Sequence, residues 1–171
     1  TKERIYSDIR VNEAMIWRCG NESLTYPIRV IQLPNAEILD DHILILRNER
    51  AKVFLKFPNN RFRPGNDAFH VDFWLDGKPI LVDTGTFSYN ARDLTDKFKS
   101  VSSHNTIQFG DAEQMPKISR FLNGQWLKLA STSILANNDY QVCWEGSYKD
   151  YKKNTHIRKI KLTSSQLEIE D

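Results

Sequence analysis

The stretch FHVDFWLDGKPILVD, residues 69–83, decides the fold. Apolar and polar side chains alternate from Phe69 to Leu75, and a second apolar run follows from Ile80 to Val82. Asp76 and Gly77 stand between the two runs. An Asp-Gly pair suits a type I′ turn, because both central residues of that turn need positive φ. The stretch therefore predicts a β-hairpin.

Outside this hairpin, most of the chain shows the same alternation of apolar and polar residues. Short apolar runs rich in β-forming residues are separated by turn residues, and they predict further strands at residues 28–31, 43–46, 53–57, 106–109, 126–130, 140–144, 156–162 and 167–169. The best helical candidate is short, at residues 91–98. Strands of this length separated by turns are typical of an all-β fold, and we expect an antiparallel layered β-sandwich.

The chain has 171 residues, enough for one domain with a hydrophobic core. The pattern is less clear in residues 1–25, which we interpret as a linker or as strands left after a missing N-terminal domain. Residues 26–171 are then the β-sandwich domain. Its last alternation, residues 167–171, resembles a strand cut short at the C-terminus.

Composition excludes several classes of protein. The net charge of +2 lacks the clustered basic excess of a nucleic-acid-binding domain. No apolar run reaches the ~18–20 residues of a membrane span, and no export signal is visible. The basic side chains from Lys149 to Lys161, Arg158 included, are interpreted as a solvated turn and strand face, with stacking by Tyr148 and Tyr151 as the alternative. Cys19 and Cys143 fit no CxxC pattern, and whether they pair stays open.

One face of the predicted hairpin carries an unusual set of side chains. His70, Asp72 and Trp74 are two residues apart in turn, so they share the face opposite to Val71 and Phe73. An aromatic platform beside a base and an acid indicates a carbohydrate or metal site. The alternative is an ordinary exposed polar face.

A second polar group follows the hairpin. Asp83 ends an apolar strand just before Gly85, where an acid is either a turn cap or a ligand. His104 and Asn105 stand just before the strand predicted at 106–109. Two imidazoles with a carboxylate suit a divalent metal such as zinc.

At these residues the chain resembles the heparinase II/III family of polysaccharide lyases. The resemblance is carried by RPGNDAFHVDFW (63–74), LVDTGT (81–86), Tyr89-Asn90, SHNT (103–106) and Gln114-Met115. It implies a large enzyme with an N-terminal α/α toroid and a C-terminal antiparallel β-domain. This chain would be most of that β-domain, and inactive alone. The family cleaves uronic-acid-containing polysaccharides by β-elimination.

The resemblance also implies roles for individual residues. His104 and Tyr89 become the catalytic candidates, and Trp74, His70 and Asn105 the candidates for substrate contact. In several members two histidines and an aspartate of the β-domain bind zinc, and Asp83 and His104 match one histidine and the aspartate. The position of the other histidine is Gly65 here. Asp83 and His104 would then either bind zinc or hydrogen-bond each other and hold the 83–89 loop.

The implied partners are an acidic polysaccharide and the toroid of the same protein, with no nucleic acid and no membrane span. The implied setting is bacterial, periplasmic or secreted. A different class of function stays open: a non-catalytic carbohydrate-binding or architectural β-domain of an exopolysaccharide system. Gly65 in place of histidine and the Trp74 platform motivate it.

Overall fold

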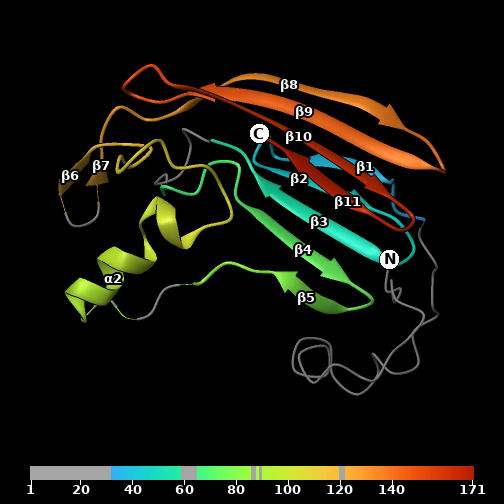
Figure 1. The fold of residues 1–171 in the computed structure, drawn as a ribbon, viewed down its shortest axis with the longest axis horizontal. Coiled ribbons are helices and arrows are strands. Elements are labelled where there is room, and N and C mark those ends of the chain that lie inside the picture. The colour runs from blue at the N-terminus through green and yellow to red at the C-terminus, as the bar shows by residue number, and fades with distance from the viewer. Residues whose placement is uncertain (1–31, 59–64, 86–87, 89, 120–121) are drawn as a thin grey trace, which may run out of the picture. The chain divides into compact units, whose positions relative to one another are not determined.

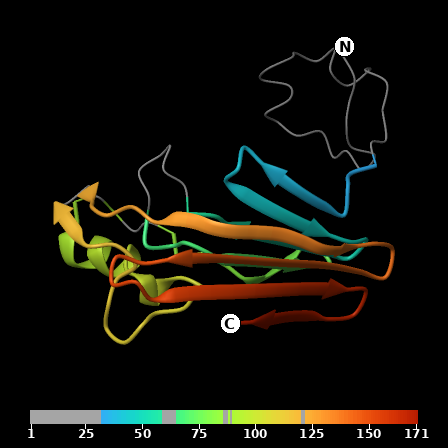
Figure 2. The same cartoon turned by 90° about the horizontal axis from the view of Figure 1, so that it is seen from above.

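Two antiparallel β-sheets pack face to face in the computed structural model of the chain (Figures 1 and 2). The structure describes residues 32–58, 65–85, 88, 90–119 and 122–171. Asn35–Asp171 form one compact unit, which is the unit described below. The predicted all-β sandwich is confirmed. The linker predicted at 1–25 and the strand predicted at 28–31 lie outside the described residues.

The first sheet is a five-stranded meander in which each strand pairs with the next along the chain. The predicted hairpin is its last pair, and the turn between the two strands has Asp76 at φ 49° and Gly77 at φ 75°. These are the positive angles that the Asp-Gly pair predicted. The strands are β1 (Ala36–Leu39), β2 (Ile43–Arg47), β3 (Ala51–Lys56), β4 (Val71–Leu75) and β5 (Lys78–Leu81).

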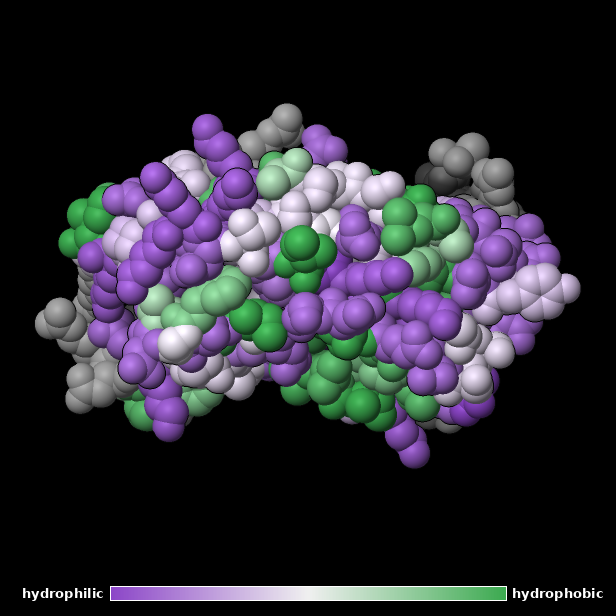
Figure 3. Space-filling model, turned by 45° about the horizontal axis from the view of Figure 1, so that its top comes forward, coloured by the Kyte–Doolittle hydropathy of each residue, from purple (hydrophilic) through white to green (hydrophobic). Residues whose placement is uncertain are grey.

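The second sheet is four-stranded, in the order β11-β10-β9-β8. Its strands carry some exposed apolar side chains, such as Ile134, Leu135 and Ile157. The face of the molecule in Figure 3 is accordingly mixed, with green apolar patches among purple polar side chains. Cys143 lies buried on β9, while Cys19 is outside the described residues. The strands are β8 (Lys128–Asn137), β9 (Gln141–Lys149), β10 (Thr155–Thr163) and β11 (Leu167–Glu170), and a separate small hairpin holds β6 (Lys117–Ser119) and β7 (Leu122–Asn123).

The predicted helix is confirmed as α2 (Arg92–Phe98), and a 3₁₀ turn follows at Val101–Ser103. The strand predicted at 106–109 is wrong, because that segment pairs with no strand. It is held instead by side chains such as Thr106, whose hydroxyl donates to the carbonyl of Ala68 at 2.7 Å. No helix in the described ranges is both long and apolar enough to span a bilayer.

Apolar side chains from both sheets meet in one core. Val53 and Leu55 of β3 face inward, as do Trp144 of β9 and Ile160 of β10, and all four are essentially fully buried. Phe69 lies at the centre, with its ring centroid 5.3 Å from that of Trp144. Burying such side chains contributes roughly 1.5–3 kcal/mol each. The core therefore fixes how the two sheets face each other.

Phe69 also interrupts the alternation that the sequence predicts. Its φ is +58°, the left-handed region, which costs on the order of 1–3 kcal/mol for such a residue. Its amide donates to the carbonyl of Lys56 at 2.7 Å, and regular pairing of β4 starts only at Val71. The predicted strand therefore loses its first two residues. His70 follows this irregular residue, and its ring is buried.

Candidate functional site

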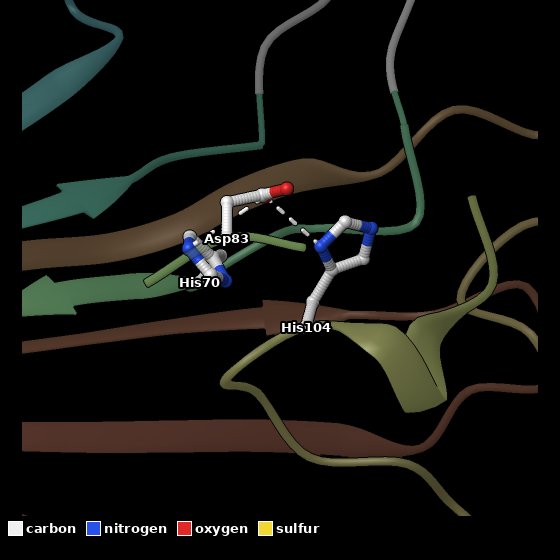
Figure 4. Close-up of side chains that lie close together, drawn as sticks. All are labelled: His70, Asp83 and His104. Atoms are coloured by element: carbon white, nitrogen blue, oxygen red, sulfur yellow. Dashed lines mark hydrogen bonds and ion pairs between the residues drawn. The ribbon is translucent and has the colours of Figure 1, made fainter. Parts of the chain in front are cut away.

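Three side chains from separate parts of the chain converge at one end of β4 and β5 (Figure 4). His70 immediately precedes β4, and Asp83 follows β5 by two residues. Because β4 and β5 are antiparallel, the start of one lies beside the end of the other. His104 reaches the same place from the end of the 3₁₀ turn. The sheet and the turn thus assemble the cluster.

Asp83 has one role for each carboxylate oxygen. Oδ1 accepts from the amide of Gly85 at 2.6 Å, which closes a local turn. Oδ2 lies 3.1 Å from Nδ1 of His104 and 3.7 Å from Nε2 of His70. Of the two alternatives left open by the sequence, the turn cap is therefore present, and the ligand role stays a prediction for the oxygen that faces the two imidazoles.

His70 has its proton position fixed by a backbone group. Its Nδ1 lies 3.0 Å from the amide nitrogen of Asn105, and a backbone N–H only donates. Nδ1 must therefore keep its lone pair, and the hydrogen-bond network assigns the ring proton to Nε2. Nε2 lies 3.3 Å from Oδ1 of Asp72, so the ring donates to a carboxylate.

This environment suggests a positioning role for His70. The residue is buried, and both of its ring nitrogens already have hydrogen-bond partners. Its Nε2 faces Asp72 and also lies near Asp83. The role in substrate contact that the sequence predicts for His70 stays a prediction.

His104 is the member of the cluster with a free nitrogen. Its Nδ1 faces Asp83, so Nδ1 carries the proton and Nε2 keeps its lone pair, again as assigned from the hydrogen bonds. No described residue makes a hydrogen bond with Nε2, and Figure 4 shows this nitrogen pointing away from Asp83. The side chain is 7% exposed, and such shielding from water strengthens the interaction with the carboxylate. We call His104 and Asp83 the dyad.

The three side chains of the cluster could be zinc ligands, and their protonation decides whether they fit. His70, Asp83 and His104 each offer one ligand atom, all within 4.8 Å of one another. A metal-bound histidine, however, normally donates a proton from its other nitrogen. In His70 that other nitrogen accepts from Asn105, so ligation through Nε2 would require removing both ring protons. These residues do not fit a zinc site.

Gly65 offers no route to a replacement ligand. A side chain added there would begin 2.9 Å from Oδ1 of Asp67, so the Asp67 side chain would have to shift. Asp67 is itself held by an ion pair with Lys56. The residue that the resemblance places at the third zinc ligand is therefore packed against an acid that is already engaged.

We expect the purified chain to hold no stoichiometric zinc after dialysis, as measured by elemental analysis. Added zinc should not raise the melting temperature, because ligand binding to the folded state alone would do so. His104→Ala and His70→Ala should leave the metal content unchanged. One zinc per chain that disappears in His104→Ala would contradict this reading of the cluster.

Asn105 joins the cluster to the sheet. Its side-chain amide nitrogen donates to the carbonyls of Val71 at 3.0 Å and Val82 at 3.1 Å. The side-chain amide oxygen is therefore the atom of Asn105 that remains for the predicted contact with substrate. Tyr89, the other predicted catalytic residue, lies outside the described residues.

Arg158 is a site residue that the sequence does not reveal. The sequence predicts that it lies on a solvated strand face, and this prediction is wrong, because the residue is only 4% exposed. Its guanidinium donates to the carbonyls of Phe69 and Asn105 and forms a two-pronged ion pair with Asp171. It therefore ties together the backbone next to His70 and next to His104. The contacts are 89 and 53 residues apart along the chain, so no local pattern signals them.

Tyr148 and His156 extend this buried network. The hydroxyl of Tyr148 receives a hydrogen bond from Gln114 at 2.8 Å and lies 3.1 Å from Nδ1 of His156. Burial raises the pKa of Tyr148, so its hydroxyl stays protonated at any physiological pH. The alternative of a stacking surface at Tyr148 is wrong, because the ring lies in the core.

Acid should weaken the fold through Asp171. Burial raises the pKa of this carboxyl, but hydrogen bonds from Arg158 and His156 outweigh it and lower the pKa to about 2. The unfolded value is about 3.9, so the unfolded chain binds more protons between the two values. The stabilisation is complete above the unfolded pKa and disappears as pH falls toward 2.

Urea unfolding of wild type and Asp171→Asn from neutral pH down to pH 2 measures this contribution. We expect the variant to be less stable at neutral pH and the gap to close in acid. A gap that is constant with pH would show that the carboxylate charge has no part in the effect.

Comparisons with known proteins agree with this architecture. The heparinase II/III-like C-terminal family matches residues 58–171. No curated protein matches the chain. A solved heparinase III structure superposes with a TM-score of 0.66 at 13% identity, over 86% of this chain and 23% of that one. A heparan sulfate lyase from Pedobacter heparinus gives a TM-score of 0.64 at 11% identity, over 91% of this chain and 25% of that one.

Identities this low show a shared fold alone, while the family match rests on the sequence itself. The chain spans about a quarter of the length of these solved structures. The match covers the hairpin, the dyad and the whole second sheet. The chain therefore belongs to the heparinase II/III-like family, of which it carries the C-terminal β-sheet domain.

Proposed function

We propose that this chain is the β-sheet part of a polysaccharide lyase that cleaves a uronic-acid-containing polymer by β-elimination. The orientation of His104 is the observation that carries the proposal. Asp83 holds the proton on Nδ1, so Nε2 is a positioned base. Membership of the family and the short span relative to the solved structures support a larger parent protein.

In the proposed reaction Nε2 of His104 takes the proton from the carbon α to the uronate carboxyl group. The electron pair forms a double bond to the β carbon, whose bond to the glycosidic oxygen breaks. That oxygen leaves with the electron pair of the broken C–O bond and receives a proton from an acid, the role proposed for Tyr89. Protonated His104 remains paired with Asp83, which stabilises the charge that it gains.

The remaining components belong to the same proposal. An α-helical toroid elsewhere in the parent protein would supply the other side of the cleft and the donors that stabilise charge on the carboxyl group. The substrate would be an acidic polysaccharide, and the setting bacterial and periplasmic or secreted. The isolated chain should then be inactive.

The test is to incubate the parent protein with a panel of uronic-acid polymers and to follow the unsaturated product by near-ultraviolet absorbance. The chain alone, assayed in parallel, controls for activity from this domain. The proposal expects turnover of at least one polymer by the parent and none by the chain. A parent without activity on any uronate polymer overturns it.

A second candidate is a non-catalytic carbohydrate-binding domain. Trp74 favours it, because its indole is 38% exposed on the outer face of β4. This candidate expects the parent to bind polymer without turnover and to lose affinity on Trp74→Ala. Calorimetry that detects no polysaccharide binding counts against it.

A further inference from the structure

We propose that a hollow beside Trp74 binds an uncharged sugar ring of the polymer. The hollow has a volume of about 550 Å³ and opens on the outer face of the first sheet. The inference deepens the proposed function and rests on it only for the presence of a polysaccharide. The residues that shape the hollow are Arg50, Lys52, Phe54, Asp72, Trp74 and Asp76.

The strand register explains why an aromatic platform forms here. Trp74 of β4 pairs with Lys52 of β3, and Asp72 pairs with Phe54, so these four side chains share the outer face of the two strands. Figure 1 shows β3 and β4 side by side. An exposed indole flanked by a second ring offers an apolar surface. The C–H face of a pyranose packs on such a surface and buries apolar area.

The indole N–H of Trp74 is also available to a ligand. Trp126 donates its N–H to the carbonyl of Asn123 at 2.6 Å, and Trp144 donates to the hydroxyl of Thr132 at 2.8 Å. Within the part of the chain that the structure describes, no acceptor meets the N–H of Trp74. A sugar hydroxyl or ring oxygen would satisfy it.

The charges of the hollow select against an anionic ring. Its lining has two cationic and three acidic side chains, a net charge of −1. Arg50 is held by a two-pronged pair with Asp76, and this hydrogen bond lowers the pKa of Asp76. Asp72 accepts from the amide of Asp83 at 2.9 Å.

Of the two cations that line the hollow, only Lys52 has no acidic partner among the described residues, and the carboxylates of Glu49 and Asp72 lie on the same rim. A uronate carboxylate that approached Lys52 would also meet these two negative charges, and their repulsion offsets the attraction of the single lysine. The hydroxyls of a neutral ring both donate and accept, so they match a rim with both kinds of group.

One residue, Asp72, links the hollow to the dyad. Asp72 lines it and also bonds to the backbone of Asp83. Asp72 and Trp74 are two residues apart on β4, about 7 Å along the strand. In this proposal a polymer with one ring at His104 extends along β4, so that another of its rings lies over the hollow. The substrate implied is a polysaccharide of mixed sequence, with neutral sugars beside uronates.

The test is nuclear magnetic resonance on the ¹⁵N-labelled full chain, with the indole peak of Trp74 assigned through Trp74→Phe. The probes are malto-, cello- and mannohexaose as neutral sugars, hyaluronan hexasaccharide as an alternating polymer, and hexagalacturonate as an all-uronate polymer. Trp126 is the internal control, because it is equally exposed but lies away from the hollow.

We expect the Trp74 peak to shift saturably with hyaluronan hexasaccharide and at least one neutral hexasaccharide, and the Trp126 peak to stay. Hexagalacturonate should shift neither peak. Trp74→Ala should weaken binding by at least about tenfold, whereas Trp126→Ala should not change it. A Trp74 peak that moves with no probe, or moves most with hexagalacturonate, overturns the inference. Binding is measured without turnover, so this result is separate from the lyase assay.

Discussion

Asp83→Asn in the parent protein is expected to lower kcat/KM on its uronate polymer by roughly 10²- to 10⁴-fold. The amide of asparagine would donate to Nδ1 of His104, so the ring proton would move to Nε2. The base would then be blocked although its position is unchanged. His104→Ala removes the base altogether and should cause a loss of similar size. The measurement is the initial rate of near-ultraviolet absorbance.

Two comparisons separate this role from a structural one. Asp41→Asn makes the same chemical change at an exposed turn and should leave the rate unchanged. Added imidazole should restore part of the activity of His104→Ala, because it supplies the missing base, and should not rescue Asp83→Asn. If Asp83→Asn retains the wild-type rate while His104→Ala does not, the carboxylate does not orient the base.

Arg158→Met is expected to reduce the free energy of unfolding by about 3–5 kcal/mol, the cost of removing one partner of a buried ion pair. The substitution leaves the carboxylate of Asp171 without its main partner. It also deprives the carbonyls of Phe69 and Asn105 of their donor. Since Phe69 is in the left-handed region, losing this bond also leaves one contact fewer to offset the cost of that backbone conformation. Urea unfolding followed by circular dichroism measures the change.

Lys161→Met is the matched control. Lys161 lies on the same strand, and its pair with Glu168, at 3.2 Å, is exposed. Exposed pairs contribute roughly 0–1 kcal/mol, so this variant should differ little from wild type. Arg158→Lys keeps the charge but loses the planar fork, and it should fall between the two. A loss below about 1 kcal/mol in Arg158→Met would mean that water replaces the guanidinium.

The sequence predicted those turns, strands and helices that are encoded by residues close together along the chain. The Asp76-Gly77 turn was predictable because the turn type itself requires positive φ at both positions. The helix at 92–98 was also found. The segment at 106–109 was expected to be a strand but pairs with none. A short run has the same composition whether its backbone joins a sheet or a side chain such as that of Thr106 anchors it to another segment. β1 was missed, since it is short and partly exposed.

The candidate site also has one part that sequence motifs predicted and another that they did not. Asp83 and His104 were chosen from motifs, and the structure puts them within hydrogen-bonding distance. The role of His70 could not be read from alternation, because Phe69 breaks the strand just before it. Only the contact with the amide of Asn105 fixes the tautomer of His70. Because that tautomer keeps a proton on Nε2, the cluster is interpreted as a hydrogen-bonded group and not as a metal site.

By itself the sequence determined the all-β class, the hairpin and the family, because side-chain periodicity, turn chemistry and ordered motifs are encoded by neighbours along the chain. Only the tertiary structure decided which nitrogen of each histidine carries a proton and which charges are buried. It also decided that Arg158 holds both histidine-bearing segments. These properties depend on groups tens of residues apart, whose distances, burial and hydrogen bonds exist only once the two sheets have packed together.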